Sequence, residues 1–382
     1  MLFDSHAHLN NGELTEEERQ AWVRAIEESP LDYVMNVGFD PASSLLAAEQ
    51  AEKYPWCYAA AGCHPHDTKD MDEAKLQMIR EIAGRDKVMA IGEIGLDYHY
   101  DLSDRDVQRE WFRRQIRLAN ELKMPIAIHA READQEVMDI LKEEGAFSDE
   151  RKSWFPKRPD PEGYVTGRPA VCKENHGKSG YSCGDAVSCK DCGNSDAGFA
   201  DGKSALPADT DSERDPASFT GKSCIADGAF GSNGGTDTDT TGSKAAASSS
   251  IALDCGAPEH TGENAESNVS MCDDARVLLH CFSGSAELGK QYVRMGATIS
   301  VAGPVTYKNN RKTVAMVSEI PLSFLLVETD SPYLTPAPFR GRPNMPPYVE
   351  HTAAKIAEIK GISFETVAKQ TKRNAMRFYG IK

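Results

Sequence analysis

Eight short apolar segments alternate with amphipathic segments along this chain, and this alternation sets the expected fold class. The expected strands are 2–9, 33–38, 56–64, 88–96, 125–130, 277–283, 297–302 and 324–329. Helical patterns lie at 15–28, 42–53, 70–84, 104–123, 133–144, 285–295, 308–318, 348–360 and 363–378. Apolar strands that alternate with helices indicate a parallel sheet with a covered outer face. Eight such units predict an α/β protein with a closed (β/α)8 TIM barrel, and no Gly-x-Gly-x-x-Gly turn follows the first strand.

One long segment does not share this alternation. Residues 148–275 hold seven of the ten cysteines and 22 acidic against 12 basic residues. Such a polar segment buries too little apolar surface to offset its ordering entropy. We therefore expect a mostly disordered, acidic, Cys-containing insertion at 148–275, between a first barrel part at 1–147 and a second at 276–382. Because it follows a helix and precedes a strand, it is predicted on the amino-terminal face, opposite the usual active-site face.

The charge balance limits the partners of this chain. Its 382 residues include 43 basic and 59 acidic side chains, which gives a net charge of −16. That charge disfavours broad binding to nucleic acid or anionic membranes through Lys and Arg. A phosphodiester substrate held by metal ions is still compatible with it, because the ions supply positive charge. The start of the sequence shows no secretory signal and no apolar run spans a bilayer, so we expect a cytoplasmic protein, with a nuclear location left open. A monomer is favoured, although the sequence does not set the oligomeric state.

Potential metal ligands stand at the carboxyl ends of five expected strands. His6 and His8 share a face of the first strand because they are two residues apart. Glu93 ends the fourth strand, and a carboxylate inside an apolar strand is unfavourable unless it is paired or coordinated. The full set is His6, His8, Glu93, His129, His280 and Asp330. Four imidazoles and two carboxylates exceed one closed four-ligand site, and they predict a two-metal centre with a bridging carboxylate.

The motifs around these residues resemble the TatD family of metal-dependent deoxyribonucleases. They are Asp-Ser-His-Ala-His-Leu at 4–9, Gly-Cys-His-Pro-His at 62–66, Gly-Glu-Ile-Gly-Leu-Asp-Tyr at 92–98, His129 with Arg131, His-Cys-Phe-Ser-Gly at 280–284 and Glu-Thr-Asp-Ser-Pro-Tyr at 328–333. The resemblance covers 1–146 and 276–382. It implies an amidohydrolase-like metal barrel and 3′–5′ exonuclease activity on DNA. It also implies that His6, His8, Glu93 and Asp330 hold one ion, and that Glu93, His129 and His280 hold the second.

Further residues are candidates for substrate contact. His64 is expected near the substrate rather than on a metal ion, and Arg131 and Arg340 are expected to pair with phosphate oxygens. Tyr98, Phe282 and Tyr333 could stack on a nucleobase. Two neighbours of the expected ligands are given structural roles: Glu328 as an interior barrel residue, and Cys281 as a core residue on the opposite face from His280.

The sequence therefore predicts a metal-dependent hydrolase that cleaves DNA phosphodiester bonds with two divalent ions. Asp330 would orient or deprotonate the attacking water, and Glu93 would be the second catalytic carboxylate. Mg²⁺, Mn²⁺ and Zn²⁺ all suit this mixture of carboxylates and imidazoles. Two alternatives remain. The same site could hydrolyse an amide or ester, such as a D-aminoacyl-tRNA ester, or the chain could be an inactive scaffold that binds partners through its acidic insertion.

Overall fold

The chain forms the predicted (β/α)8 barrel, as seen in a computed structural model that describes residues 1–167 and 270–382. Within these residues, eight parallel strands form one sheet in the order β1-β2-β3-β4-β5-β8-β9-β10. They are β1 (Leu2–Ala7), β2 (Leu31–Val37), β3 (Cys57–Ala61), β4 (Val88–Asp97), β5 (Ile126–Arg131), β8 (Val277–Leu279), β9 (Thr298–Val301) and β10 (Leu325–Val327). The sheet closes on itself just beyond β10, where the Asp330 N–H donates to the His6 carbonyl and the His8 N–H to the Ser331 carbonyl, both at 2.9 Å.

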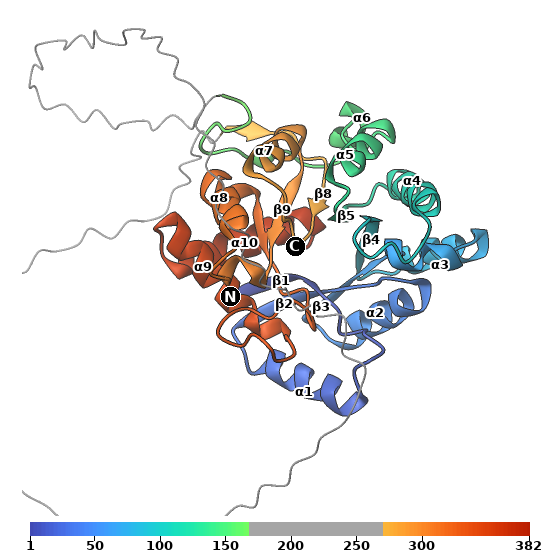
Figure 1. Ribbon diagram of the computed structural model, residues 1–382, viewed down its shortest axis with the longest axis horizontal. Helices are drawn as coiled ribbons and strands as arrows, with labels where there is room; N and C mark the ends of the chain where they lie inside the picture. Colours follow the sequence, from blue (N-terminus) through green and yellow to red (C-terminus); the bar gives the residue numbers. More distant parts are fainter. Residues whose placement is uncertain (168–269) are drawn as a thin grey trace, which may run out of the picture. The chain divides into compact units, whose positions relative to one another are not determined.

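Helices surround the strands, with α1 to α3 next to the first strands and α7 to α9 next to the last (Figure 1). They are α1 (Glu16–Glu27), α2 (Pro41–Lys53), α3 (Glu73–Ala83), α4 (Arg105–Leu122), α5 (Asp134–Glu143), α7 (Ala286–Met295), α8 (Arg311–Glu319), α9 (Val349–Lys360) and α10 (Phe364–Tyr379). Local signals start and end them: Thr15 and Glu18 form a capping box at α1, and Gly296 ends α7 with a φ of 109°. Among the helices in the described ranges, none is long and apolar enough to cross a bilayer.

The inside of the barrel is filled at its amino-terminal end. The apolar side chains there come from seven of the eight strands and range in size from alanine to phenylalanine: Phe3, Met35, Val37, Ala60, Ala90, Ala127, Leu278 and Leu326. Helix α10 covers this end with Phe378 and Tyr379; the Tyr379 ring stacks on Phe3 at 5.9 Å, and its hydroxyl donates to the Ser5 carbonyl. Because apolar groups fill this end, the polar side chains inside the barrel gather at the carboxyl ends of the strands.

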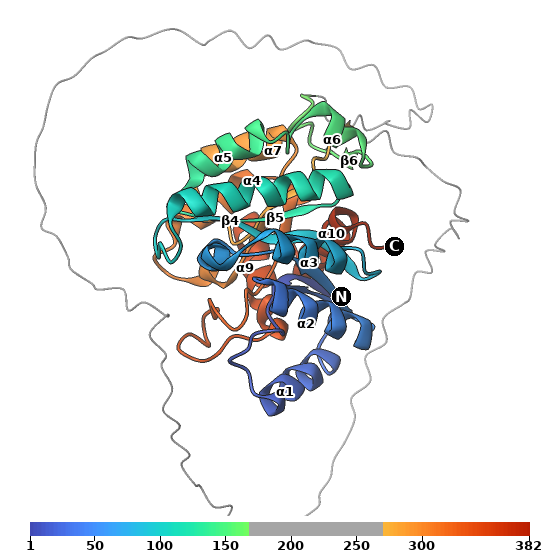
Figure 2. The same ribbon diagram turned by 90° about the vertical axis from the view of Figure 1, so that its right-hand side faces the viewer.

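The two ends of the segment 148–275 have defined structure. They form α6 (Asp149–Ser153) and β6 (Arg158–Pro159), which lie next to each other in Figure 2, and β7 (Met271–Cys272), which pairs antiparallel with β6. Arg151 is buried and donates to the Ala275 carbonyl at 2.9 Å and to Asn120 Oδ1 at 2.7 Å. Arg158 is buried too and donates to the Ala297 carbonyl at 2.9 Å.

These contacts fasten both ends to the barrel at the amino-terminal ends of β8 and β9. The averaged composition of 148–275 did not reveal them, because they depend on single arginines that satisfy backbone carbonyls. Residues 168–269 lie outside the described residues, and the insertion itself stays a prediction.

Candidate metal centre

The six predicted ligands meet at the carboxyl end of the barrel around Glu93. Glu93 Oε1 lies 2.7 Å from His280 Nε2 and 2.9 Å from His129 Nδ1. Its other oxygen, Oε2, lies 3.3 Å from His6 Nε2 and 3.8 Å from His8 Nε2. The two oxygens of one buried carboxylate therefore face two different pairs of imidazoles.

Asp330 completes the cluster from beyond β10. Its Oδ1 lies 3.4 Å from His8 Nε2 and 3.8 Å from His6 Nε2. The backbone of Asp330 has a φ of 57°, a left-handed conformation that Asp tolerates better than most residues. Together with the hydrogen bond from its N–H to the His6 carbonyl, this turn directs the carboxylate toward the barrel axis.

The hydrogen bonds behind the imidazoles show where their protons lie. His8 Nδ1 is 2.8 Å from the Val37 carbonyl, which can only accept, so Nδ1 carries a proton and Nε2 is the ring nitrogen that faces the carboxylates of Glu93 and Asp330. His129 Nε2 is 3.0 Å from Asp97 Oδ2, and its Nδ1 faces Glu93 Oε1. A ring nitrogen and a carboxylate oxygen at these distances need a proton or a metal ion between them, so each of these contacts is a place where a metal ion can replace a proton.

The donor set thus fits a metal ion. In the described part of the chain, three groups have ligand atoms within 4.8 Å of one another: His6, His8 and Glu93; His6, His280 and Asp330; and His64, Glu93 and His129. Burial acts to raise the pKa of Glu93, but the surrounding histidines, His280 first among them, outweigh it and hold that pKa well below its ordinary value. Glu93 is therefore a carboxylate at neutral pH, ready to bind a cation.

His64 differs from the other histidines of the cluster. Its Nε2 lies 3.7 Å from Glu93 Oε1, and its Nδ1 accepts a hydrogen bond from the His66 N–H at 3.2 Å. Burial and the neighbouring His129 lower the pKa of His64 well below its ordinary value, so the ring is neutral and carries its proton on Nε2. A ring that presents N–H toward the centre suits contact with substrate better than metal ligation.

The two predicted phosphate-binding arginines lie outside this close cluster. Arg131 ends β5 and is exposed, with its guanidinium 4.7 Å from the centroid of the Tyr100 ring. Arg340 is exposed as well and lies 4.3 Å from the centroid of Tyr307, in the loop that follows Asp330. Each guanidinium is thus held against an aromatic ring, with its charge available to solvent.

The three candidates for base stacking separate clearly. Phe282 is buried and packs against Tyr292, so it belongs to the core and is not a stacking surface. Tyr98 donates to Glu136 at 2.6 Å and carries the Arg105 guanidinium on its ring. Tyr333 is 46% exposed, and its ring centroid is 6.4 Å from that of His8. Among these three rings, Tyr333 alone combines exposure with proximity to the cluster.

Three neighbours of the ligands have roles that the sequence did not indicate. Asp97 contacts His129 and is part of the site, although no role was expected for it. Glu328 is fully buried inside the barrel as predicted, but it also lies 3.4 Å from His280 Nδ1. The prediction of Cys281 as a core residue is wrong: the residue is only half-buried, β8 ends at Leu279, Cys281 has a φ of 43°, and its N–H donates to Glu328 at 2.6 Å. Strand alternation does not extend past the strand end, so it could not place Cys281. The same alternation does place Asp97 on the face of Glu93, four residues away, and could have identified it.

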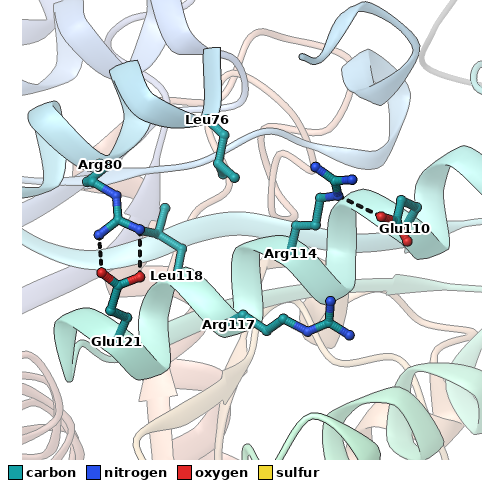
Figure 3. A pocket seen from close by; sticks show the side chains of 7 residues that line it. All are labelled: Leu76, Arg80, Glu110, Arg114, Arg117, Leu118 and Glu121. Carbon is teal, nitrogen blue, oxygen red and sulfur yellow. Dashed lines mark hydrogen bonds and ion pairs between the residues drawn. The ribbon is translucent and has the colours of Figure 1, made fainter. Parts of the chain in front are cut away.

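A surface pocket between α3 and α4 is separate from the cluster. Leu76, Arg80, Glu110, Arg114, Arg117, Leu118 and Glu121 line it (Figure 3). Its arginines are paired: Arg80 with Glu121, Arg114 with Glu110 and Arg117 with Glu144. Because these arginines and the glutamates Glu110 and Glu121 already neutralise one another in ion pairs, the pocket is not a candidate catalytic site.

The sequence profile of the TatD related DNase family matches residues 3–151 and 257–380. All six clustered ligands fall inside the matched ranges. The chain belongs to the TatD related DNase family. Between the two ranges, the match to the TatD profile is interrupted in the region of the expected insertion.

Individual TatD relatives agree with this assignment. An uncharacterized metal-dependent hydrolase of Bacillus subtilis, YabD, is 32% identical to this chain over 381 residues, and the match covers 100% of each chain. A Pantoea ananatis protein named 3′-5′ ssDNA/RNA exonuclease TatD is 22% identical over 388 residues, again over 100% of both. The crystal structure of YjjV, a TatD homologue of Escherichia coli, aligns with a TM-score of 0.62 at 17% identity over 100% of this chain and 98% of that chain. The chain is thus a metal-dependent hydrolase of the TatD family with the TatD barrel fold.

Proposed function

We propose that this chain is a 3′–5′ exonuclease that hydrolyses phosphodiester bonds of DNA at a centre of two divalent ions. The observation that carries this proposal is the arrangement around Glu93, whose Oε2 faces His6 and His8 while its Oε1 faces His129 and His280. A bridging carboxylate with separate imidazoles on each oxygen is what a pair of ions requires. One position would use His6, His8, Glu93 and Asp330, and the other Glu93, His129 and His280.

The nature of the donors narrows the choice of ion. Four of the six donors are imidazoles, and Mg²⁺ binds mostly to oxygen ligands and water. Mn²⁺ and Zn²⁺ accept imidazole readily, so we favour them over Mg²⁺. Divalent ions at this position supply positive charge to the scissile phosphodiester and make water more acidic.

The protein's own groups then have distinct tasks. Asp330 accepts the proton of the attacking water; hydrogen bonding to His8 outweighs the effect of burial and lowers the pKa of Asp330, so it is ionised. As the water oxygen bonds to phosphorus, the bond to the leaving oxygen breaks, and the His64 Nε2–H donates a hydrogen bond to that oxygen. Arg131 and Arg340 bind neighbouring phosphates of the strand.

A nucleic-acid substrate also accounts for the exposed ring of Tyr333 beside the cluster. A phosphodiester bound to the ions beside Glu93 would bring an adjacent nucleobase within reach of this ring. Stacking of a base on an aromatic side chain is typical of proteins that bind single strands. The relative from Pantoea ananatis carries the name of a single-strand exonuclease, which supports the same substrate class.

The test is nuclease activity of the purified chain on a 5′-labelled single-stranded DNA oligonucleotide, with Mn²⁺, Zn²⁺ or Mg²⁺ and with a chelator. We expect stepwise shortening from the 3′ end that stops with the chelator. The same preparation is assayed for release of the amino acid from D-aminoacyl-tRNA. Deacylation without cleavage of DNA or RNA would replace the nuclease proposal by the ester hydrolase, and inactivity on both in metal-loaded protein would favour the scaffold.

A further inference from the structure

The carboxylate of Asp97 connects two histidines at the end of β4. It is buried, and its Oδ2 lies 3.0 Å from His129 Nε2 and 3.0 Å from His66 Nε2. Its Oδ1 accepts the backbone N–H groups of His99 at 3.0 Å and Tyr100 at 2.9 Å. The carboxylate is therefore fixed on both oxygens and cannot turn away from His129.

This contact determines which nitrogen of His129 is free. A carboxylate oxygen only accepts hydrogen bonds, so His129 keeps a proton on Nε2, and Nδ1, which lies 2.9 Å from Glu93 Oε1, is the nitrogen that can bind a cation shared with Glu93. Without the carboxylate, the proton can move to Nδ1, where it would occupy the lone pair that a cation needs.

We propose that Asp97 is a positioning residue that commits His129 Nδ1 to the ion shared with Glu93 and His280. This inference rests on the proposed two-ion centre. Because carboxylates behind a ligating imidazole raise its basicity and fix its orientation, Asp97 strengthens this position specifically.

The two ion positions differ in what stands behind their histidines. On the side of His6 and His8, His8 Nδ1 contacts the neutral Val37 carbonyl. On the other side, His129 is backed by Asp97 and His280 Nδ1 lies 3.4 Å from the Glu328 carboxylate. Removal of Asp97 should therefore weaken the ion at Glu93, His129 and His280, and leave the ion at His6 and His8 in place.

The experiment measures zinc binding to the full chain by equilibrium dialysis and elemental analysis, for Asp97→Leu, Asp97→Asn and Gln108→Ala. Gln108 is the matched control: its Oε1 accepts the Asp97 N–H at 2.9 Å and its Nε2 donates to the Asp97 carbonyl, yet it holds only the backbone of this loop. We expect Asp97→Leu to weaken one of two zinc ions by about 10- to 100-fold. Asp97→Asn keeps an acceptor without its charge and should fall between that variant and the unaltered protein, whereas Gln108→Ala should bind both ions normally.

A second readout reports the proton directly. With ¹⁵N-labelled histidine and zinc bound, the ring resonances of His129 should show a protonated Nε2 and a zinc-bound Nδ1 in the unaltered protein, and this pattern should be lost at the same zinc concentration in Asp97→Leu. Unchanged zinc affinity and unchanged ring resonances in folded Asp97→Leu would overturn the inference. So would an equal loss of zinc in Gln108→Ala, because the role of Asp97 would then be to shape the loop.

Failure of the proposed function is visible separately. An unaltered protein that binds one zinc ion contradicts the two-ion centre. If that single ion is weakened by Asp97→Leu and not by Gln108→Ala, Asp97 still acts through His129.

Discussion

Glu93 Oε1 lies 2.7 Å from His280 Nε2, although the segment 148–275 separates these two residues in the sequence. The contact exists because β4 pairs with β5 and β5 pairs with β8, which places the carboxyl ends of these strands side by side. The proposed chemistry therefore depends on a register that joins the two parts of the barrel, and the predictions below test the side chains and the connections that maintain it.

Replacement of Glu93 should remove both metal and activity. Glu93→Gln keeps the shape of the side chain. It removes the negative charge that the two carboxylate oxygens share and that neutralises a cation. We expect hydrolysis to fall to background and metal content, measured by elemental analysis, to drop. Glu121→Gln is the control, since Glu121 pairs with Arg80 on the surface. Near-normal turnover of Glu93→Gln would refute the central role of this carboxylate.

Asp330→Asn should separate chemistry from folding. The backbone N–H of residue 330 still donates to His6, so barrel closure is kept, while the group that accepts a proton is lost. A positioned acid–base group contributes about 10²–10⁴-fold, so we expect kcat to fall at least about 10²-fold with an unchanged circular dichroism spectrum. Equal kcat values for the two proteins would remove Asp330 from the mechanism.

Removal of metal should lower thermal stability as well as activity. A chelator leaves the lone pairs and carboxylates of the cluster facing one another, and an ion present at 100 times its Kd stabilises a folded protein by about 2.7 kcal/mol. We expect a lower Tm in chelator and recovery of both Tm and hydrolysis when Mn²⁺ or Zn²⁺ is returned. Full activity in extensively chelated, metal-free protein would exclude a catalytic metal.

Arg151 should be important for stability and not for catalysis. Arg151→Met leaves Asn120 Oδ1 and the carbonyls of Ala275 and Met124 without their buried donor. An unsatisfied buried polar group costs about 1–3 kcal/mol, so we expect the free energy of unfolding in urea to fall by about 3 kcal/mol. Lys152→Met, one residue away, is the control. If both variants unfold at the same urea concentration as the original chain, Arg151 does not anchor this region.

Two deletions should behave differently. Thr166 Oγ1 and Ser270 Oγ are 2.8 Å apart, so a short Gly/Ser linker can replace 168–269 without moving the ends. Loop-closure entropy then changes by only about 2–3 kcal/mol, in the stabilising direction. We expect the deletion of 168–269 to give a folded, active barrel that unfolds in one cooperative thermal transition. The wider deletion of 148–275 should have a lower Tm, because it removes Arg151 and Arg158. A narrower deletion that folds but loses metal or activity would show that 168–269 contributes to the catalytic face.

The strand and helix pattern and the ligand set could be predicted because they follow local rules. Strand alternation places His6, His8 and Glu93, and the ends of strands place His129 and His280. The contacts of Glu328 with His280, of Asp97 with His66 and of Arg151 with Asn120 could not be predicted, because each depends on how separate segments pack. Cys281 and Asp330 lie beyond the last strand residues, where turn conformation replaces alternation.

The antiparallel pairing of β6 with β7 has a practical consequence. Ser270 accepts a hydrogen bond from the Asp160 N–H at 2.7 Å, and β5 hydrogen-bonds to β8 across the same junction. Non-covalent contacts therefore hold the two halves of the barrel in register at the point where the chain leaves and re-enters it. A polypeptide that ends at 167 and a second that begins at 270 have the interface needed to assemble by fragment complementation, with His280 and Asp330 supplied by one piece and Glu93 by the other.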